Sequence, residues 1–188
     1  MLMNVKEAIR QRRTIRLFAD RPIDKKVLTE LMELGRFYPS GGNRQPLAYA
    51  FVTKEDTRAE VFSCLRWAGY LPDFVIAPER RPQAYIVILA DCAGADQDVG
   101  AAAMSFLLAA KSEGIDGCWL GAIDRPKLGE ILGIDPSWRI AAVLALGYPA
   151  QESVAEDMVQ DHKYYLDEEN VLHVPKRTQK QIIVYSDL

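Results

Sequence analysis

The sequence is poor in the residues that build disulfide frameworks and metal sites. Its 188 residues include three cysteines, Cys64, Cys92 and Cys118, which are odd in number, far apart and in no C-x-x-C pair. A disulfide framework and a zinc site both need more closely paired ligands. We therefore expect reduced, buried thiols in a cytoplasmic protein, and no metal.

Histidine is equally scarce, which limits acid–base catalysis. His162 and His173 both lie near the C-terminus, and no Ser/His/Asp, Cys/His or metal constellation can be assembled around them. We therefore expect no catalytic acid or base. A protein of this kind depends on a cofactor that brings its own chemistry.

Long apolar runs and an excess of positive charge are also missing. The most apolar stretch, residues 100–110, is interrupted by Ser105 and is too short to span a membrane, and no signal-peptide pattern is visible. The net charge of -3 argues against binding to nucleic acid or an anionic membrane. G-x-G-x-x-G and G-x-x-x-x-G-K-[ST] motifs are absent, so neither a Rossmann dinucleotide site nor a P-loop is supported.

What remains is the composition of one globular domain, with 49% hydrophobic and 26% charged residues. Apolar runs predict strands at 48–53, 84–90, 116–123 and 138–147, and periodicity predicts helices at 55–68 and 96–113. By periodicity alone this is an α/β-type sheet covered on both faces. The helix at 96–113 is apolar almost all round, so the core or a second subunit must cover it.

Capping residues mark three further helices. Asn4 with Glu7 forms a capping-box pattern, Asp24 precedes a periodic segment, and Asp124 precedes a short helix that Gly133 ends. After Pro149 the chain shows little helical periodicity and finishes in a strand-like segment, 182–185. Such a long irregular tail is expected to wrap over a partner subunit.

Three clusters could carry chemistry. Arg12, Arg13 and Arg16 flank Thr14 and can converge on one anion, although a solvated basic helix end would look the same. The loop at 40–46 has paired glycines and amide side chains that can approach a ligand closely, as can many surface loops. The segment 117–122 ends a buried strand, where ligands gather in open sheets.

The order of these motifs resembles that of the FMN-dependent nitroreductase family. The likeness spans nearly the whole chain. It rests on Arg-Arg-Thr-x-Arg at 12–16, Pro-Ser-Gly-Gly-Asn-Arg-Gln-Pro at 39–46, the opening of a central dimer helix at 98–103, Gly-Cys-Trp-Leu-Gly at 117–121, Leu-Gly-Tyr-Pro at 146–149, and the basic pair Lys176-Arg177. One such motif is a weak signal, but several in the correct order are a strong one.

The resemblance implies an α+β fold with a mixed, mainly antiparallel sheet flanked by helices. It also implies an intertwined homodimer in which residues 1–188 form a single FMN-binding domain, with 150–188 as a tail that wraps the partner and adds a strand to its sheet. The activity implied is hydride transfer from NADH or NADPH, through flavin N5, to an electron-poor acceptor such as a nitroaromatic or a quinone. The implied mechanism is ping-pong, with protons from water.

Cofactor contacts follow from the same resemblance. Arg12, Lys176 and Arg177 would hold the FMN phosphate, Arg13 and Thr14 would lie along the ribityl chain and pyrimidine edge, and Arg16 would sit near N1 and O2, where reduction leaves negative charge. Pro39, Ser40, Gly41 and Asn43 would come from the other subunit, with Gln45 nearby, and the backbone at Leu120 and Gly121 would approach N5. The acceptor lid would come from 69–82 or the tail, where Trp67, Tyr70 and Phe74 indicate an apolar slot.

Three alternatives remain open at the level of sequence. A specialised relative could dehydrogenate or dehalogenate one particular substrate. A carrier or sensor could bind FMN without oxidising NAD(P)H. A basic-helix interaction protein would bind no flavin, although the acidic net charge counts against it.

Overall fold

The computed structural model describes residues 3–187 and is built around one antiparallel sheet. The strands are β1 (Leu47–Val52), β2 (Ala84–Ala90), β3 (Asp116–Leu120) and β4 (Arg139–Gly147), in the order β1-β2-β4-β3. Every neighbouring pair is antiparallel, which confirms the α+β class and corrects the α/β-type reading from periodicity. Hydrophobic periodicity locates strands but does not give their direction.

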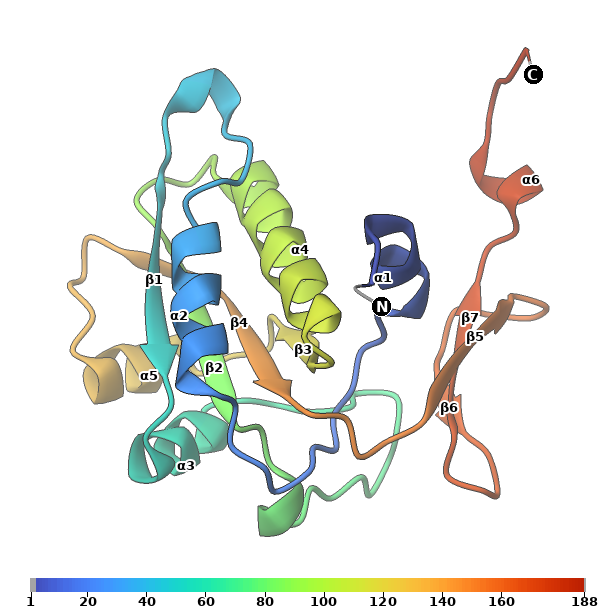
Figure 1. Cartoon of the computed structure of the whole chain (residues 1–188), viewed down its shortest axis with the longest axis horizontal. Helices are drawn as coiled ribbons and strands as arrows, with labels where there is room; N and C mark the ends of the chain where they lie inside the picture. Colours follow the sequence, from blue (N-terminus) through green and yellow to red (C-terminus); the bar gives the residue numbers. More distant parts are fainter. Residues whose placement is uncertain (1–2, 188) are drawn as a thin grey trace.

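Helices cover both faces of this sheet, as expected. The helices α2 (Lys25–Leu34) and α4 (Asp96–Ser112) pack on the face that carries Ile86 and Leu144. The helices α3 (Glu55–Ser63) and α5 (Arg125–Leu132) pack on the other face. Figure 1 shows the resulting layers, with α1 (Val5–Gln11) beside the C-terminal end of α4.

The predicted helix caps are confirmed. Asn4 and Glu7 form a reciprocal capping box, the Asp24 carboxylate accepts from Lys26 N at 2.7 Å, and the Asp124 carboxylate accepts from Lys127 N at 3.3 Å. Gly133 ends α5 in the left-handed conformation, with φ 61°. These local signals depend only on neighbours in sequence, so the sequence alone could locate them.

Other sequence predictions are corrected. The helix expected to reach residue 68 ends at Ser63, because Leu65 pairs with Ile123 and Arg66 N donates to Ala122 O at 3.1 Å. Cys64 and Cys118 are buried, but Cys92 is exposed in the turn after β2.

The tail folds into a small sheet that stands away from the body of the molecule (Figure 1). Its strands are β5 (Ser153–Asp157), β6 (Tyr165–Leu166) and β7 (Leu172–Lys176), in the order β5-β7-β6. The segment predicted to be strand-like, 182–185, forms no strand within the described chain. Ile182 ends the helix α6 (Gln179–Ile182), and residues 183–185 are exposed and pair with no strand of residues 3–187. That this segment adds a strand to a partner's sheet stays a prediction.

No helix in the part of the chain that the structure describes is long and apolar enough to cross a membrane.

Candidate functional site

The arginine segment after α1 runs alongside β3 and extends the sheet at its edge. Thr14 forms a parallel bridge with Gly117, and Ile15 N donates to Gly117 O at 3.1 Å. Residues 12–16 therefore advance in the same direction as β3, from its first residue, Asp116, towards its end. This brings Arg12 to one end of the strip and Arg16 towards the other.

The guanidinium groups of this strip have no carboxylate of their own. The nearby carboxylate of Asp116 is already paired, because Lys111 Nζ donates to its Oδ2 at 2.7 Å. None of the ion pairs between described residues includes Arg12, Arg13 or Arg16. Burial, and then the neighbouring charge of Arg13, lower the pKa of Arg12. Closely spaced cations without paired anions can converge on an external anion.

Arg16 is the most informative residue of the strip. Arg16 as a whole is 8% exposed, and the Nε and Nη1 atoms of its guanidinium are buried without a hydrogen-bond partner among the described residues. Its backbone N donates to Gln151 Oε1 at 3.1 Å, and the ring of Tyr164 lies 4.3 Å from the guanidinium carbon. A buried cation with unused donors fits the predicted position beside the electron-rich edge of a flavin ring.

The amide-rich loop holds an unusual backbone conformation. It contains the short helix η1 (Gly41–Asn43), and φ is positive at Gly42, Asn43 and Gln45, at 58°, 54° and 51°. Gln45 N donates to Ser40 Oγ at 2.9 Å, and Gln45 Nε2 donates to Asn43 Oδ1 at 3.1 Å. Left-handed conformations at non-glycine residues carry strain and cluster at ligand sites.

Within one chain this loop is far from the arginine strip. Tyr38, directly before the loop, has its pKa raised by burial and then by the charge of Asp98, which lies in the first turn of α4. Arg13 N lies 3.5 Å from Asp116 Oδ1, and Lys111, in the last turn of α4, pairs with the same carboxylate. The loop and the strip thus lie at opposite ends of α4, a helix about 25 Å long (Figure 1).

The remaining predicted residues lie at two further places. Leu120 ends β3 and is buried, and Gly121 is exposed directly after it, where an added Cβ would meet no atom within 4 Å. Lys176 ends β7 and Arg177 follows it, and both line a hollow of about 520 Å³ together with His162. No hydrogen bond or ion pair between described residues joins this basic pair to Arg12.

Both segments expected to form the acceptor lid line one cavity of about 600 Å³. Its lining includes Tyr70 and Phe74 from the excursion and Tyr165 from the tail, next to Leu17. Tyr70 also contacts Tyr164, which covers Arg16, with their ring centroids 5.1 Å apart. Trp67 instead stacks on Phe62 at 5.5 Å and does not line this cavity.

Sequence reasoning missed one histidine cluster. His173 Nδ1 lies 2.8 Å from Glu156 Oε2, His173 Nε2 lies 3.1 Å from Asp167 Oδ2, and the His173 ring stacks on Tyr165. These residues are spread over three strands of the tail, so only the fold brings them together. Within residues 3–187 no group of His, Cys, Asp and Glu side chains is arranged to hold a metal.

Comparison with known proteins places this geometry in a family. The model of the Nitroreductase family matches residues 9–74 and 75–148. A protein of Archaeoglobus fulgidus with the provisional name NADH dehydrogenase/NAD(P)H nitroreductase is 29% identical, over 75% of this chain and 83% of that protein.

Two solved structures share the fold. An FMN-dependent nitroreductase of Clostridium difficile has a TM-score of 0.69 at 18% identity and covers 96% of this chain and 98% of its own. The NADPH:FMN oxidoreductase of Vibrio harveyi complexed with NAD+ has a TM-score of 0.68 at 21% identity and covers 99% of this chain and 78% of its own. With most of its length matched by the family model, the chain belongs to the nitroreductase family, and its general activity is that of an oxidoreductase.

Proposed function

We propose that the chain is an FMN-dependent oxidoreductase that uses NADH or NADPH to reduce an electron-poor small molecule, such as a nitroaromatic or a quinone, by a ping-pong mechanism. When bound, FMN supplies hydride chemistry at its N5 atom, between the nicotinamide donor and the acceptor. The protein's own residues bind, orient and charge-stabilise that group.

The observation that carries the proposal is the buried, unpartnered guanidinium of Arg16. A fixed cation in a site of low dielectric constant favours negative charge on its neighbour more strongly than a solvated one does. Beside N1 and O2 of the ring, Arg16 would therefore favour the reduced cofactor. Tyr164 stacks on Arg16 and restricts where its guanidinium can lie.

Arg12 would hold the phosphate end of the cofactor, and Arg13 would lie along its ribityl chain and pyrimidine edge. Their guanidiniums have no ion-pair partner among the described residues, and Thr14 fixes the backbone register against Gly117. Lys176 and Arg177 would complete the phosphate site once the tail is packed against a partner subunit. Leu120 and Gly121, at the other end of β3, would lie near N5, where the open space beside Gly121 leaves room for a ring.

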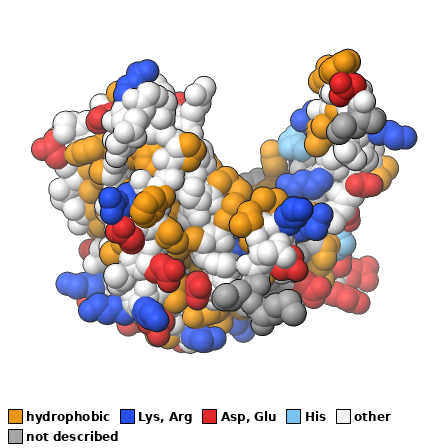
Figure 2. All heavy atoms as spheres, turned by 45° about the horizontal axis from the view of Figure 1, so that its top comes forward, with side chains coloured by type: hydrophobic (Ala, Val, Ile, Leu, Met, Phe, Trp, Pro, Cys, Tyr) orange, Lys and Arg blue, Asp and Glu red, His pale blue; other side chains and the backbone are white. Residues whose placement is uncertain are grey.

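A second copy of the chain would complete the site. The loop residues Pro39, Ser40, Gly41, Asn43 and Gln45 are about one helix length from Arg16 in the same chain, so another subunit must supply them to the same flavin. Met104 on α4 and Val5 and Ile9 on α1 are exposed apolar residues that such a partner would cover. The small tail sheet, β5 to β7, stands across a notch from the body (Figure 2), and the tail as a whole, 150–188, would wrap that partner.

Proton transfer in this proposal needs no side chain. Burial raises the pKa of Cys118 to about 11, although Arg16 opposes the shift, so the thiol stays protonated and is no nucleophile. His173 is held by two carboxylates in the tail sheet. Water entering the 600 Å³ cavity would supply protons to the acceptor.

The proposal is tested by purifying the protein without added flavin, recording its visible spectrum, and titrating it anaerobically with NADH and NADPH. Flavin absorption bands that bleach with either nucleotide would support the proposal and identify the donor. Bands that never bleach would favour an FMN carrier. A colourless protein that does not take up added FMN would contradict the assignment.

A further inference from the structure

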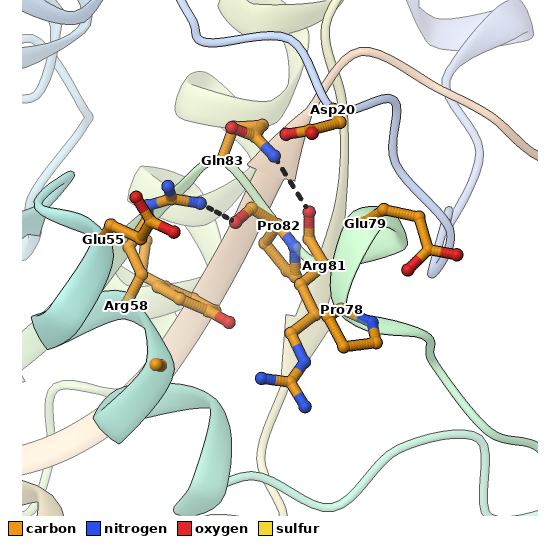
Figure 3. A pocket seen from close by; sticks show the side chains of 10 residues that line it. Asp20, Glu55, Arg58, Pro78, Glu79, Arg81, Pro82 and Gln83 are labelled. Carbon is orange, nitrogen blue, oxygen red and sulfur yellow. Dashed lines mark hydrogen bonds between the residues drawn. The ribbon is translucent and has the colours of Figure 1, made fainter.

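A second polar cavity lies outside the proposed flavin site. It has a volume of about 350 Å³ and lies between α3, the short helix η2 (Pro78–Arg80) and the start of β2. Figure 3 shows that its walls come from these separate elements, with Arg58 on one side and Glu79 and Pro78 on the other. None of its lining residues belongs to the arginine strip, the loop at 39–45 or the tail.

The floor of this cavity contains a buried hydroxyl group with nothing to bond. Tyr85 is 1% exposed and packs in the core beneath the sheet, yet its Oη atom has no hydrogen-bond partner among residues 3–187. Burial raises the pKa of Tyr85 far above its usual value, although Arg58 and Arg81 oppose the shift. The group is therefore a neutral O–H donor that faces two cations.

Those two cations are held in place by the protein. Arg58 Nε donates to Thr53 O at 3.1 Å, and Arg58 Nη1 donates to Pro82 O at 2.8 Å. The Arg81 guanidinium lies over the ring of Phe62 at 4.3 Å, and its Nε atom is buried with no partner among the described residues. Side chains fixed in this way are preorganised to bind a ligand with little further loss of entropy.

The unused groups are all donors, which defines the chemistry of the ligand. Tyr85 O–H and Arg81 Nε–H both need an acceptor, and buried donors in native proteins are normally satisfied. The carboxylates that line the cavity, Asp20, Glu55 and Glu79, are exposed at its rim, and no ion pair between described residues joins them to Arg58 or Arg81. The floor therefore accepts an oxyanion.

The rim restricts which oxyanion can enter. With two arginines inside and three carboxylates outside, a dianion such as phosphate meets a repulsive entrance, whereas an ammonium group there is attracted. A cavity of about 350 Å³ matches a small metabolite. We propose that this cavity binds a small amino-carboxylate, with its carboxylate on Tyr85, Arg58 and Arg81 and its ammonium at the acidic rim.

The proposal is tested with three matched probes on the full chain. 4-Aminobutyrate carries both groups, butyrate lacks the ammonium, and butylamine lacks the carboxylate. Binding is followed by shifts of the backbone amide resonances of residues 55–59, 79–81 and 83–85. We expect 4-aminobutyrate to bind most tightly, butyrate more weakly, and butylamine to cause no saturable shifts.

Two variants and a control assign the binding to the floor. Tyr85→Phe removes one buried oxygen and keeps the ring, and Arg81→Gln removes the guanidinium. Each is expected to weaken 4-aminobutyrate binding by about tenfold or more, as for loss of a hydrogen bond to a charged group. Arg66→Gln, which removes an arginine shortly after α3 that does not line the cavity, should bind as the wild type does.

Saturable butylamine binding, or binding of 4-aminobutyrate that Tyr85→Phe and Arg81→Gln leave unchanged, would overturn the proposal. No saturable shift with either carboxylate would also overturn it. Since no flavin residue lines this cavity, such a failure leaves the oxidoreductase proposal untouched. Near-ultraviolet circular dichroism of each variant shows that the fold is retained.

Discussion

At the scale of single residues, Arg16 is the main determinant of the proposed chemistry. A guanidinium buried with unused donors is unfavourable in an isolated protein, since a lost charged hydrogen bond costs about 1.5–3 kcal/mol. Its persistence is understandable if a ligand supplies the missing acceptors. The unpaired state of Arg12 and Arg13 nearby has the same explanation.

Replacing Arg16 should therefore change the reduction potential of the bound cofactor as well as its affinity for the protein. Arg16→Gln removes the charge and is expected to lower the two-electron reduction potential of bound FMN by about 30 mV or more, because 1.4 kcal/mol corresponds to about 30 mV for such a couple. The potential is measured spectroscopically against a reference dye, with excess FMN present. Arg21→Gln, which removes an arginine that stacks on Tyr148, is the control. An unchanged potential in Arg16→Gln would remove the residue from the ring site.

The scale of secondary structure explains why β3 can support a binding strip. Gly117 lets β4 and α4 approach β3 closely, since an added Cβ would lie 2.8 Å from Ala145 O, Leu107 Cδ2 and Leu146 Cδ2. Gly121, at the other end of β3, has open space beside it.

These two glycines make a matched pair. Gly117→Ala is expected to lower the free energy of unfolding by about 1–3 kcal/mol, because the backbone oxygen cannot move away without breaking the sheet. Gly121→Ala should change it by less than about 0.5 kcal/mol. Urea unfolding measures both. Equal effects in the two variants would mean that the packing around β3 is looser than described.

The tail sheet contains a pH-sensitive clamp. Hydrogen bonds to Glu156 and then to Asp167 raise the pKa of His173, and the bond with His173 lowers the pKa of Glu156. A raised histidine pKa stabilises the sheet fully below the unfolded value of about 6.5, and this contribution is lost as pH rises through the folded value. The carboxylate contribution is lost as pH falls through the lowered folded pKa of Glu156.

Hydrogen exchange of the amides at 172–174 tests this clamp. After correction for intrinsic rates, protection should be greatest near pH 6 and fall by pH 8.5. The variant His173→Gln should show no such fall, because it has no proton to lose. The same pH profile in wild type and variant would rule out His173 as the cause.

A feature of the fold could be predicted from the sequence when the residues that determine it are close together in the chain. Helix caps at Asn4, Asp24 and Asp124 are short-range patterns, and the sequence located all three correctly. The antiparallel pairing of β2 with β4 joins residues 49 to 62 positions apart in the chain, and hydrophobic patterns carry no information about strand direction. The orientation came from the family resemblance alone.

The same condition decided which parts of the candidate site could be predicted from the sequence. Residues 12–16 stood out as a cluster because they are adjacent in sequence, whereas the cluster of Glu156, Asp167 and His173 depends on three strands meeting. The cavity floored by Tyr85 left no trace in the sequence either, because its donors come from α3, from the residue after η2 and from β2.

At the scale of the whole molecule, the account requires two chains. The loop at 39–45 and the strip at 12–16 lie at opposite ends of α4, apolar residues on α1 and α4 are exposed, and the apolar side chains at 182–185 are exposed as well. A homodimer would resolve all three features at once, since each subunit would lend its loop to the flavin of the other.

Co-expression of two defective chains tests this claim most directly. One chain carries Arg16→Gln, and the other carries Ser40→Ala with Asn43→Ala. If each flavin site takes its strip from one chain and its loop from the other, every mixed dimer has one intact site and one doubly defective site. Random pairing then restores about a quarter of the sites, measured as flavin per chain and as NAD(P)H oxidation. If both quantities stay at the level of the separate variants while mixed dimers form, the site lies within a single chain and the account is wrong.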